Sequence, residues 1–210
     1  MATSGKGTGI VGYNVQAAVD TKNHLIVAHE VTNVGHDRGQ LSKLGEQAQY
    51  ATGHDALTVI ADRGYFKGED ILASEQGGMT PYVPKPLTSG AKAEGRFVKQ
   101  DLVYVAEDNT YRCPAGESLT WRFSSVEHRM VLHTYWTTRC ESCALKMQCT
   151  TGQQRRIKRW EHEAVLDAMQ HRLDQAPDIM RIRRQTVEHP FGTLKAWMGA
   201  THFPQSRNTW

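Results

Sequence analysis

The feature that most constrains the fold is a short apolar run in the first third of the chain, Leu57-Thr-Val-Ile-Ala61. A run of this length predicts a strand buried on both faces. It lies between two stretches whose apolar residues recur at helical intervals, residues 37–50 and 67–75. Asp37 suits the N-cap of the first helix, and the glycine pair at 77–78 ends the second. Helices alternating with a buried strand predict an α/β fold.

Strand patterns lie on both sides of this region. Tyr13 to Val19 alternates in polarity, and His24 to Val31 is rich in β-branched residues. The polar residues 20–23 between them are typical of a turn, so the two runs predict a β-hairpin. Tyr82-Val83, just before Pro84, predicts a further strand.

The chain divides into four segments by pattern and composition. The middle part holds short strand-like runs and all four cysteines, which predicts an inserted β-rich subdomain. Helical spacing then returns at 160–176 and at about 178–198, where Pro190 should kink the helix or mark a restart. The strand-like runs are residues 96–99, 102–106, 118–122 and 131–136. The expected segments are a loose lead-in at 1–12, a first domain part at 13–84, the insertion at 85–155 and a helical part at 156–210.

Charge and hydropathy exclude some classes of protein. The net charge of +3 is too small to imply a polyanion partner by itself. It is concentrated, however, because residues 155–184 carry eight Lys and Arg against five Asp and Glu. No apolar run approaches the roughly 18 residues that a membrane span needs. Residues 1–12 lack the apolar core of a secretory signal, so we expect a cytoplasmic protein.

The four cysteines are Cys113, Cys140, Cys143 and Cys149. Without a secretory signal, such clustering favours metal binding over disulfides. One Cys-x-x-Cys pair with two outlying cysteines fits a tetrahedral zinc site, and an iron–sulfur cluster uses the same ligand type. The alternative is four unrelated free thiols.

Asp62 directly follows the predicted buried strand. A carboxylate at the carboxyl end of such a strand lies where α/β folds place their sites. The alternative is structural: Asp62 could cap the helix that starts near Lys67, or close a turn.

Glu188 lies on the last predicted helix with two basic residues, Arg184 and Lys195, on nearly the same face. This polar stripe borders an apolar stripe that includes Val187 and Phe191. The alternative is an ordinary solvated i,i+4 ion pair between Arg184 and Glu188.

Together these pieces resemble the catalytic domain of DDE transposases from bacterial insertion sequences, in their family order and over nearly the whole chain. The group with a Cys-bearing insertion before the last acid is the most similar. An Arg-x3-Glu-x6-Lys signature of one branch is present, although Arg181 stands where that branch has Tyr. The segments that carry the resemblance are Gly12-Tyr-Asn-Val-Gln-Ala-Ala-Val-Asp20, Val59-Ile-Ala-Asp-Arg-Gly-Tyr65, Tyr111-Arg-Cys-Pro-Ala-Gly116, Cys140-x-x-Cys143 and Arg183-Arg-x-x-Val-Glu-His-Pro-Phe-Gly-x-x-Lys195.

The resemblance implies an RNase H-like fold, a mixed sheet flanked by helices. It also implies that three carboxylates hold Mg²⁺ or Mn²⁺ for DNA cleavage and strand transfer. Asp62 would be the second of these acids and Glu188 the third, while Arg184 and Lys195 would contact DNA phosphates. Hard cations need such oxygen ligands, and the negative transition state needs positive charge nearby. Transposon ends and target DNA are the implied partners, and a homodimer is the usual assembly.

The first acid of the trio has no counterpart in the pattern. The family places it on a strand before the hairpin, whereas here only the hairpin precedes the first helix. Asp20 fits a turn and Asp37 a helix start, so neither suits the role. We therefore expect a transposase piece truncated at both ends and inactive in strand cleavage. The alternatives are a nucleic-acid-binding module with a structural metal site and an RNase H-like nuclease without strand transfer.

Overall fold

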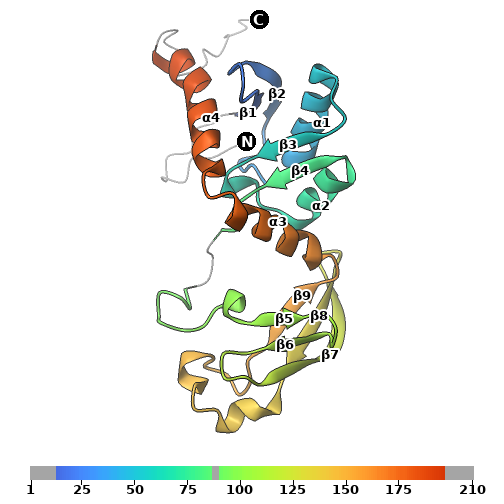
Figure 1. The fold of residues 1–210 in the computed structure, drawn as a ribbon, viewed down its shortest axis with the longest axis vertical. Coiled ribbons are helices and arrows are strands. Elements are labelled where there is room, and N and C mark those ends of the chain that lie inside the picture. Colours follow the sequence, from blue (N-terminus) through green and yellow to red (C-terminus); the bar gives the residue numbers. More distant parts are fainter. Residues whose placement is uncertain (1–12, 87–89, 197–210) are drawn as a thin grey trace, which may run out of the picture. The chain divides into compact units, whose positions relative to one another are not determined.

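The computed structural model describes residues 13–86 and 90–196 (Figure 1). The chain forms two compact units. The first unit comprises Met1–Pro86 and Val165–Trp210, and the second comprises Leu87–Ala164. The sequence placed the limits of the insertion at 85 and 155, so the second unit extends further toward the C-terminus than expected.

The first unit opens with the expected hairpin. Strands β1 (Asn14–Val19) and β2 (Ile26–Thr32) pair antiparallel, with Asn14 opposite Thr32. Asp20 organises the turn, because its carboxylate accepts hydrogen bonds from the backbone N–H groups of Lys22 and Asn23 at 3.1 and 3.0 Å. This is the Asx-type turn that the polar residues 20–23 predicted.

Helix α1 (Leu41–Thr52) starts four residues later than expected. Asp37 is not its N-cap, which corrects the sequence prediction. The carboxylate of Asp70 instead accepts hydrogen bonds from the N–H groups of Leu41 and Ser42, at 2.8 and 3.2 Å. The cap therefore comes from another helix, and the Asp37 side chain is directed elsewhere.

A parallel β-α-β unit follows. Strand β3 (Leu57–Ile60) leads through helix α2 (Gly68–Gln76) to strand β4 (Met79–Tyr82), which pairs parallel with β3. Gly78 makes the turn into β4 at φ +80°, where a Cβ would meet the Asp55 carbonyl oxygen at 2.8 Å. The buried side chains of this core are Leu41, Ala61, Ile71, Val83 and Met169.

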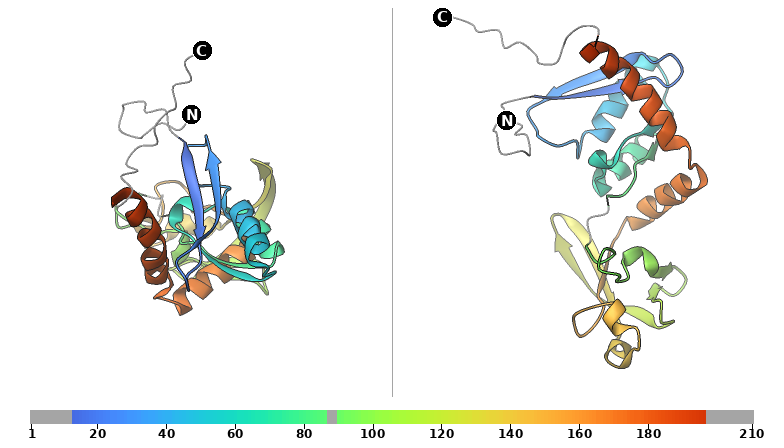
Figure 2. Two further views of the ribbon diagram at one scale, coloured as in Figure 1. Left: turned by 90° about the horizontal axis from the view of Figure 1, so that it is seen from above. Right: turned by 90° about the vertical axis from the view of Figure 1, so that its left-hand side faces the viewer.

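Two helices complete the first unit. Helix α3 (Glu163–Gln175) supplies the buried Met169, which is 1% exposed, and helix α4 (Ile179–Ala196) follows after a short turn. Helix α4 is continuous through Pro190, so the predicted restart does not occur. Figures 1 and 2 show α1 and α4 on opposite sides of the strands β1 to β4.

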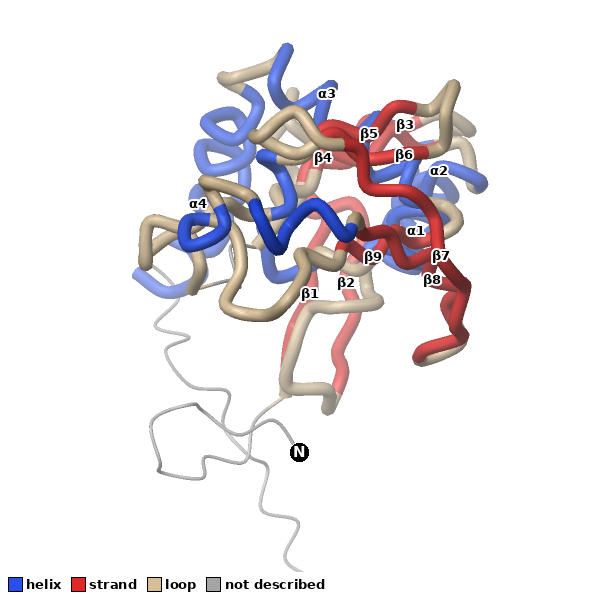
Figure 3. The backbone as a smooth tube through the Cα atoms, turned by 90° about the horizontal axis from the view of Figure 1, so that it is seen from below, coloured by secondary structure: helices blue, strands red, loops and turns tan. Residues whose placement is uncertain are grey.

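The second unit is built on one antiparallel sheet in the order β5-β6-β7-β8-β9 (Figure 3). Residues 96–99 do not form the predicted strand, and strand β6 was not predicted. Strand β9 was placed in the helical C-terminal part but pairs with β8. The strands are β5 (Val103–Val105), β6 (Thr110–Arg112), β7 (Ser118–Glu127), β8 (Met130–Trp136) and β9 (Ile157–Trp160).

The α/β class is confirmed in the described residues. The expected single mixed sheet is not: strands β1 and β2 form one two-stranded sheet, and β3 and β4 form another. Within the described residues, no helix is long and apolar enough to cross a lipid bilayer.

Candidate functional site

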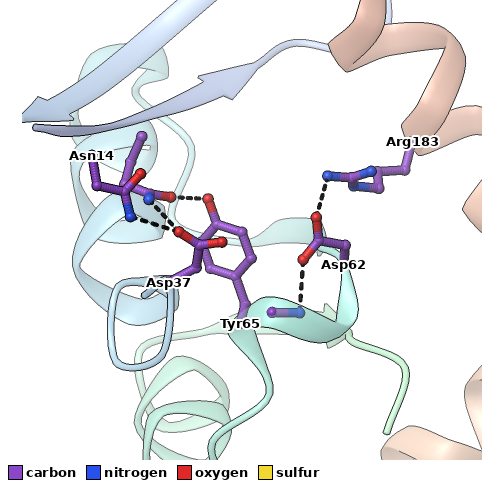
Figure 4. A network of polar contacts seen from close by, with 7 residues as sticks. Asn14, Asp37, Asp62, Tyr65 and Arg183 are labelled. Carbon is purple, nitrogen blue, oxygen red and sulfur yellow. Dashed lines mark hydrogen bonds and ion pairs between the residues drawn. The ribbon is translucent and has the colours of Figure 1, made fainter. Parts of the chain in front are cut away.

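Asp62 lies directly after β3 and caps the single-turn 3-10 helix Arg63–Tyr65. Its Oδ1 accepts a hydrogen bond from the Gly64 N–H at 2.8 Å (Figure 4). The structural alternative considered for this residue is therefore correct in part. Asp62 closes a turn but does not cap α2, whose N-cap is Lys67.

The second oxygen of Asp62 faces helix α4. Oδ2 lies 2.7 Å from Nη2 of Arg183, and the Asp62 side chain keeps 41% of its surface exposed (Figure 4). At this exposure we expect the ion pair to stabilise the fold by no more than about 1 kcal/mol. Its main consequence is positional, because it connects the end of β3 to α4 across 121 residues of sequence.

A second carboxylate, Asp37, lies beside Asp62. Its Oδ1 accepts hydrogen bonds from the side-chain amides of Asn14 at 2.8 Å and Gln16 at 2.7 Å. A Cβ on Gly64 would stand 2.9 Å from Asp62 Oδ1 and 3.0 Å from Asp37 Oδ2, so both carboxylates border the same point. A larger residue at this position would force one or both carboxylates to shift. Sequence reasoning missed this pairing because Asp37 was assigned to a helix cap.

Tyr65 completes the polar network. Its hydroxyl donates to the side-chain oxygen of Gln16, which is almost fully buried (Figure 4). Burial raises the pKa of Tyr65 well above its usual value, and the negative charges of Asp37 and Asp62 act in the same direction. Arg183 opposes them and lowers the pKa. The phenol therefore stays protonated at neutral pH and can donate a hydrogen bond.

The other predicted site residues lie further along α4. Arg184 and Glu188 are exposed, and among the described side chains they do not form the i,i+4 ion pair that was the alternative. The contact between α4 and Asp62 is made by Arg183 rather than by either of them. Lys195 lies near the end of the same helix, but its side chain is outside the described part of the structure.

A cavity of about 890 Å³ opens beside this network. It is bordered by strands β1 and β3 and by helices α1 and α4, and Asp37, Asp62 and Arg183 are among its lining residues. Both charged groups and apolar side chains therefore border one space in the first unit.

In the second unit, the four cysteines line one small pocket. All four are partly buried, and none forms a disulfide. Burial raises the pKa of the Cys149 thiol; Arg155 opposes this, while the three other cysteines raise it further. The thiols are thus close enough to influence one another electrostatically.

The donor groups of the two units suit different metals. Asp37 and Asp62 offer the carboxylate oxygens that Mg²⁺ prefers, and the cysteines offer the thiols that Zn²⁺ prefers. In the residues that the structure describes, however, no group of three or more His, Cys, Asp or Glu side chains is already arranged to hold an ion. The donor types fit, and binding would have to draw the ligands together.

Comparison with known proteins gives one match. A family model described as the transposase DDE domain matches residues 2–207 of the chain. No curated protein and no solved structure matches.

Proposed function

This chain belongs to the transposase DDE domain family, and we propose that its first unit contributes a divalent-metal site for DNA strand cleavage and strand transfer. In this proposal Asp62 and Glu188 hold Mg²⁺ or Mn²⁺, and Arg184 and Lys195 contact DNA phosphates. The substrates are transposon ends and target DNA.

One observation carries the proposal. Asp62 follows a parallel strand and reaches toward α4, the helix that also bears Glu188. Carboxyl ends of parallel strands are the usual site position in α/β folds. A carboxylate pair on these two elements suits a hard divalent cation, which when bound would activate the attacking oxygen and offset the charge of the phosphate.

The residues of this chain have separate tasks around that ion. Arg183 neutralises Asp62 while no cation is present, and it has to release Oδ2 before that oxygen can ligate a metal. The Gly64 N–H holds Oδ1 of Asp62, while the side-chain amides of Asn14 and Gln16 hold Asp37. Arg184 is exposed and can reach a phosphate without breaking an internal contact.

We further propose that the 210-residue chain alone does not cut DNA, because only two of its acids, Asp62 and Glu188, are assigned to the three carboxylate positions of the family. Metal binding by two carboxylates should be weak. The test is Mg²⁺ titration by calorimetry and nicking of end-containing DNA, with Asp62→Asn and the exposed loop control Asp55→Asn. We expect the unaltered chain to bind Mg²⁺ weakly and not to nick DNA. Asp62→Asn should abolish the Mg²⁺ binding, and Asp55→Asn should retain it. If the chain nicks DNA in the presence of Mg²⁺ and Asp62→Asn abolishes the nicking, the proposal that the chain alone is inactive is wrong.

The cysteines have a structural role in this proposal. Cys113, Cys140, Cys143 and Cys149 would bind one Zn²⁺ and hold the turns of the second unit together. Elemental analysis of the purified chain should find about one zinc per chain. Cys149→Ser should lower the zinc content, and the exposed neighbour control Ser142→Ala should not. Four freely reactive thiols and no metal would overturn the zinc assignment.

A second candidate function is nucleic-acid binding without catalysis. The observation that favours it is an aromatic and basic surface on the second unit, where Arg122 and Arg156 lie over the Trp136 ring at 5.4 and 5.1 Å. Such a surface suits a phosphate backbone and unstacked bases. Binding that survives Asp62→Asn but fails in Arg122→Ala would favour this function.

The remaining alternative is an RNase H-like nuclease, which strand-transfer products on a target DNA would exclude. A homodimer and a cytoplasmic location complete the proposal. Analytical ultracentrifugation tests the first, and fractionation of cells that express the chain tests the second.

A further inference from the structure

The pocket that Cys113, Cys140, Cys143 and Cys149 line in the second unit, here called the thiol pocket, is built from tight turns. Cys113 follows β6, and its C=O accepts a hydrogen bond from the Gly116 N–H at 2.8 Å. The other three cysteines lie in, or directly after, two short 3-10 helices. The pocket has a volume of about 20 Å³, which is the space of about one water molecule or one ion. An iron–sulfur cluster contains several iron and sulfide ions and needs more space, so the thiol pocket suits a single metal ion.

The charged side chains that border the thiol pocket are basic. Lys146 and Arg155 line it together with the four cysteines, and among the described lining residues there is no Asp or Glu. A cysteine that ligates zinc does so as the thiolate, so one Zn²⁺ with four cysteine ligands carries an excess of negative charge. Two basic side chains at the same pocket offset that excess, whereas they gain little from four neutral thiols.

Arg155 also has a buried donor without an acceptor. Its Nη1 donates a hydrogen bond to the backbone C=O of Cys149 at 3.2 Å, which holds the guanidinium at the thiol pocket. Its Nε is buried and has no hydrogen-bond partner among the described residues. A buried donor in this condition lowers stability, and it is rare in native proteins without a functional reason. A thiolate would be a favourable acceptor, because hydrogen bonds between oppositely charged groups are the stronger ones.

We propose that Arg155 is a positioning residue for one Zn²⁺ in the thiol pocket and that it acts on the sulfur ligands rather than on the metal. This role rests on the zinc assignment proposed above for the four cysteines. The Nε–H of Arg155 donates to a ligand thiolate, and the guanidinium offsets part of the negative charge of the zinc-bound pocket. Groups that hydrogen-bond to metal ligands orient those ligands, and their loss typically lowers metal affinity by about 10–100-fold.

The first test measures zinc affinity by competition with a chelator on the whole 210-residue chain. Arg155→Met should weaken zinc binding by about tenfold or more. Arg155→Lys keeps the charge but not the planar donor group, so its affinity should be intermediate. The matched control is Arg139→Met, because Arg139 precedes a cysteine in sequence but is exposed and does not line the thiol pocket. Arg139→Met should leave zinc affinity unchanged, and equal affinities for Arg155→Met and the unaltered chain overturn the proposal.

The absorption spectrum of bound Co²⁺ separates this role from a merely structural one. A hydrogen bond or a positive charge at a thiolate stabilises the sulfur electrons, so Arg155→Met should shift the sulfur-to-cobalt charge-transfer band to longer wavelength. Arg139→Met should leave the band unmoved. If Arg155→Met binds more weakly but its band does not move, Arg155 only supports the turn at Cys149 and the proposal is wrong. Should Arg155→Met fail to fold, the same shift is expected in Arg155→Gln, and an unmoved band there overturns the proposal.

Failure of the zinc assignment gives a different result from failure of the role of Arg155. If the unaltered chain and the variants bind neither Zn²⁺ nor Co²⁺, both the zinc assignment and the role of Arg155 are wrong. If the unaltered chain and Arg155→Met bind zinc equally tightly with the same Co²⁺ spectrum, only the role of Arg155 is wrong. Because the measurements use neither Mg²⁺ nor DNA, they can fail independently of the catalytic proposal for the first unit.

Discussion

The two units differ in where their strands find partners. In the second unit each strand pairs with the next one in sequence, and five strands close on a core that holds Tyr111, Leu119 and Tyr135. In the first unit the four strands among the described residues form two separate pairs, and a cavity lies beside β1 and β3. Polar groups gather at the end of β3 in the first unit, whereas aromatic rings dominate the interior of the second.

The side chains that distinguish the two units differ in kind: packed aromatic rings in the second unit and partly exposed carboxylates in the first. Tyr104, Tyr111 and Tyr135 pack with ring centroids 5.1 to 6.4 Å apart, and the guanidinium of Arg159 lies 3.8 Å from the Tyr104 ring centre. Such contacts are self-contained and add to burial. The first unit instead keeps two carboxylates, Asp37 and Asp62, partly exposed beside a cavity.

The largest expected effect is on the second unit. Tyr135 is 1% exposed, and its hydroxyl donates to Asn109 at 2.8 Å. Tyr135→Ala should lower the free energy of unfolding of this unit by about 3–5 kcal/mol, because it removes a buried ring. Tyr135→Phe should cost only about 1 kcal/mol, the value of the hydrogen bond. Urea unfolding followed by hydrogen exchange measures both, and equal loss of protection in the first unit would break the comparison.

The next effect concerns the first unit. Asp70 is buried and caps α1 through Leu41 and Ser42. Asp70→Ala should lower the free energy of unfolding by about 1–2 kcal/mol, because the first N–H groups of α1 lose their acceptor. Glu46→Ala on the exposed face of α1 is the control and should change stability by less than about 0.5 kcal/mol. If the two variants behave alike, Asp70 does not carry the cap.

The same contrast explains what the sequence could predict. Elements set by local pattern were predictable: the hairpin at Asp20, the strand before Asp62 and the helices all occur close to their expected positions, although the residues of β3 are partly or fully exposed rather than buried. The Asx turn and the helical periodicity are local signals that need no tertiary information. Strand β6 has only three residues, too few for a period to show.

The site was less predictable because its contacts span the sequence. Asp62 was found from its place after a strand, but its partner Arg183 is 121 residues away, and the sequence pattern gave Arg183 no role of its own. Asp37 was read as a cap, since an acid before a helix usually is one. The actual cap, Asp70, is 29 residues downstream and leaves Asp37 free to accept from Asn14 and Gln16. Which of the two acids caps α1 can be seen only in the tertiary structure.

A smaller effect should appear at alkaline pH. Burial and two carboxylates raise the pKa of Tyr65 in the folded chain, whereas in the unfolded chain it ionises near about pH 10. The unfolded state therefore loses its proton first, so stability is fully present below about pH 10 and falls as pH rises toward the folded pKa. Tyr65→Phe should flatten this fall, and the exposed control Tyr50→Phe should not. The free energy of unfolding is measured by urea titration at several pH values. If it falls equally above about pH 10 in the unaltered chain, Tyr65→Phe and Tyr50→Phe, Tyr65 is not the cause of the fall.

The smallest effect on stability distinguishes the two neighbouring arginines. Arg183→Ala and Arg184→Ala should each change the free energy of unfolding by less than about 1 kcal/mol, because Arg183 has a partly exposed partner and Arg184 is exposed.

The two substitutions should differ in their effects on Mg²⁺ affinity and on DNA binding. Arg183→Ala frees Asp62 Oδ2 and removes a positive charge, so Mg²⁺ should bind more tightly in calorimetry. Arg184→Ala should leave Mg²⁺ affinity unchanged and weaken DNA binding, with a smaller salt dependence. Equal Mg²⁺ affinities in the two variants would show that the Arg183 contact does not compete with a cation at Asp62.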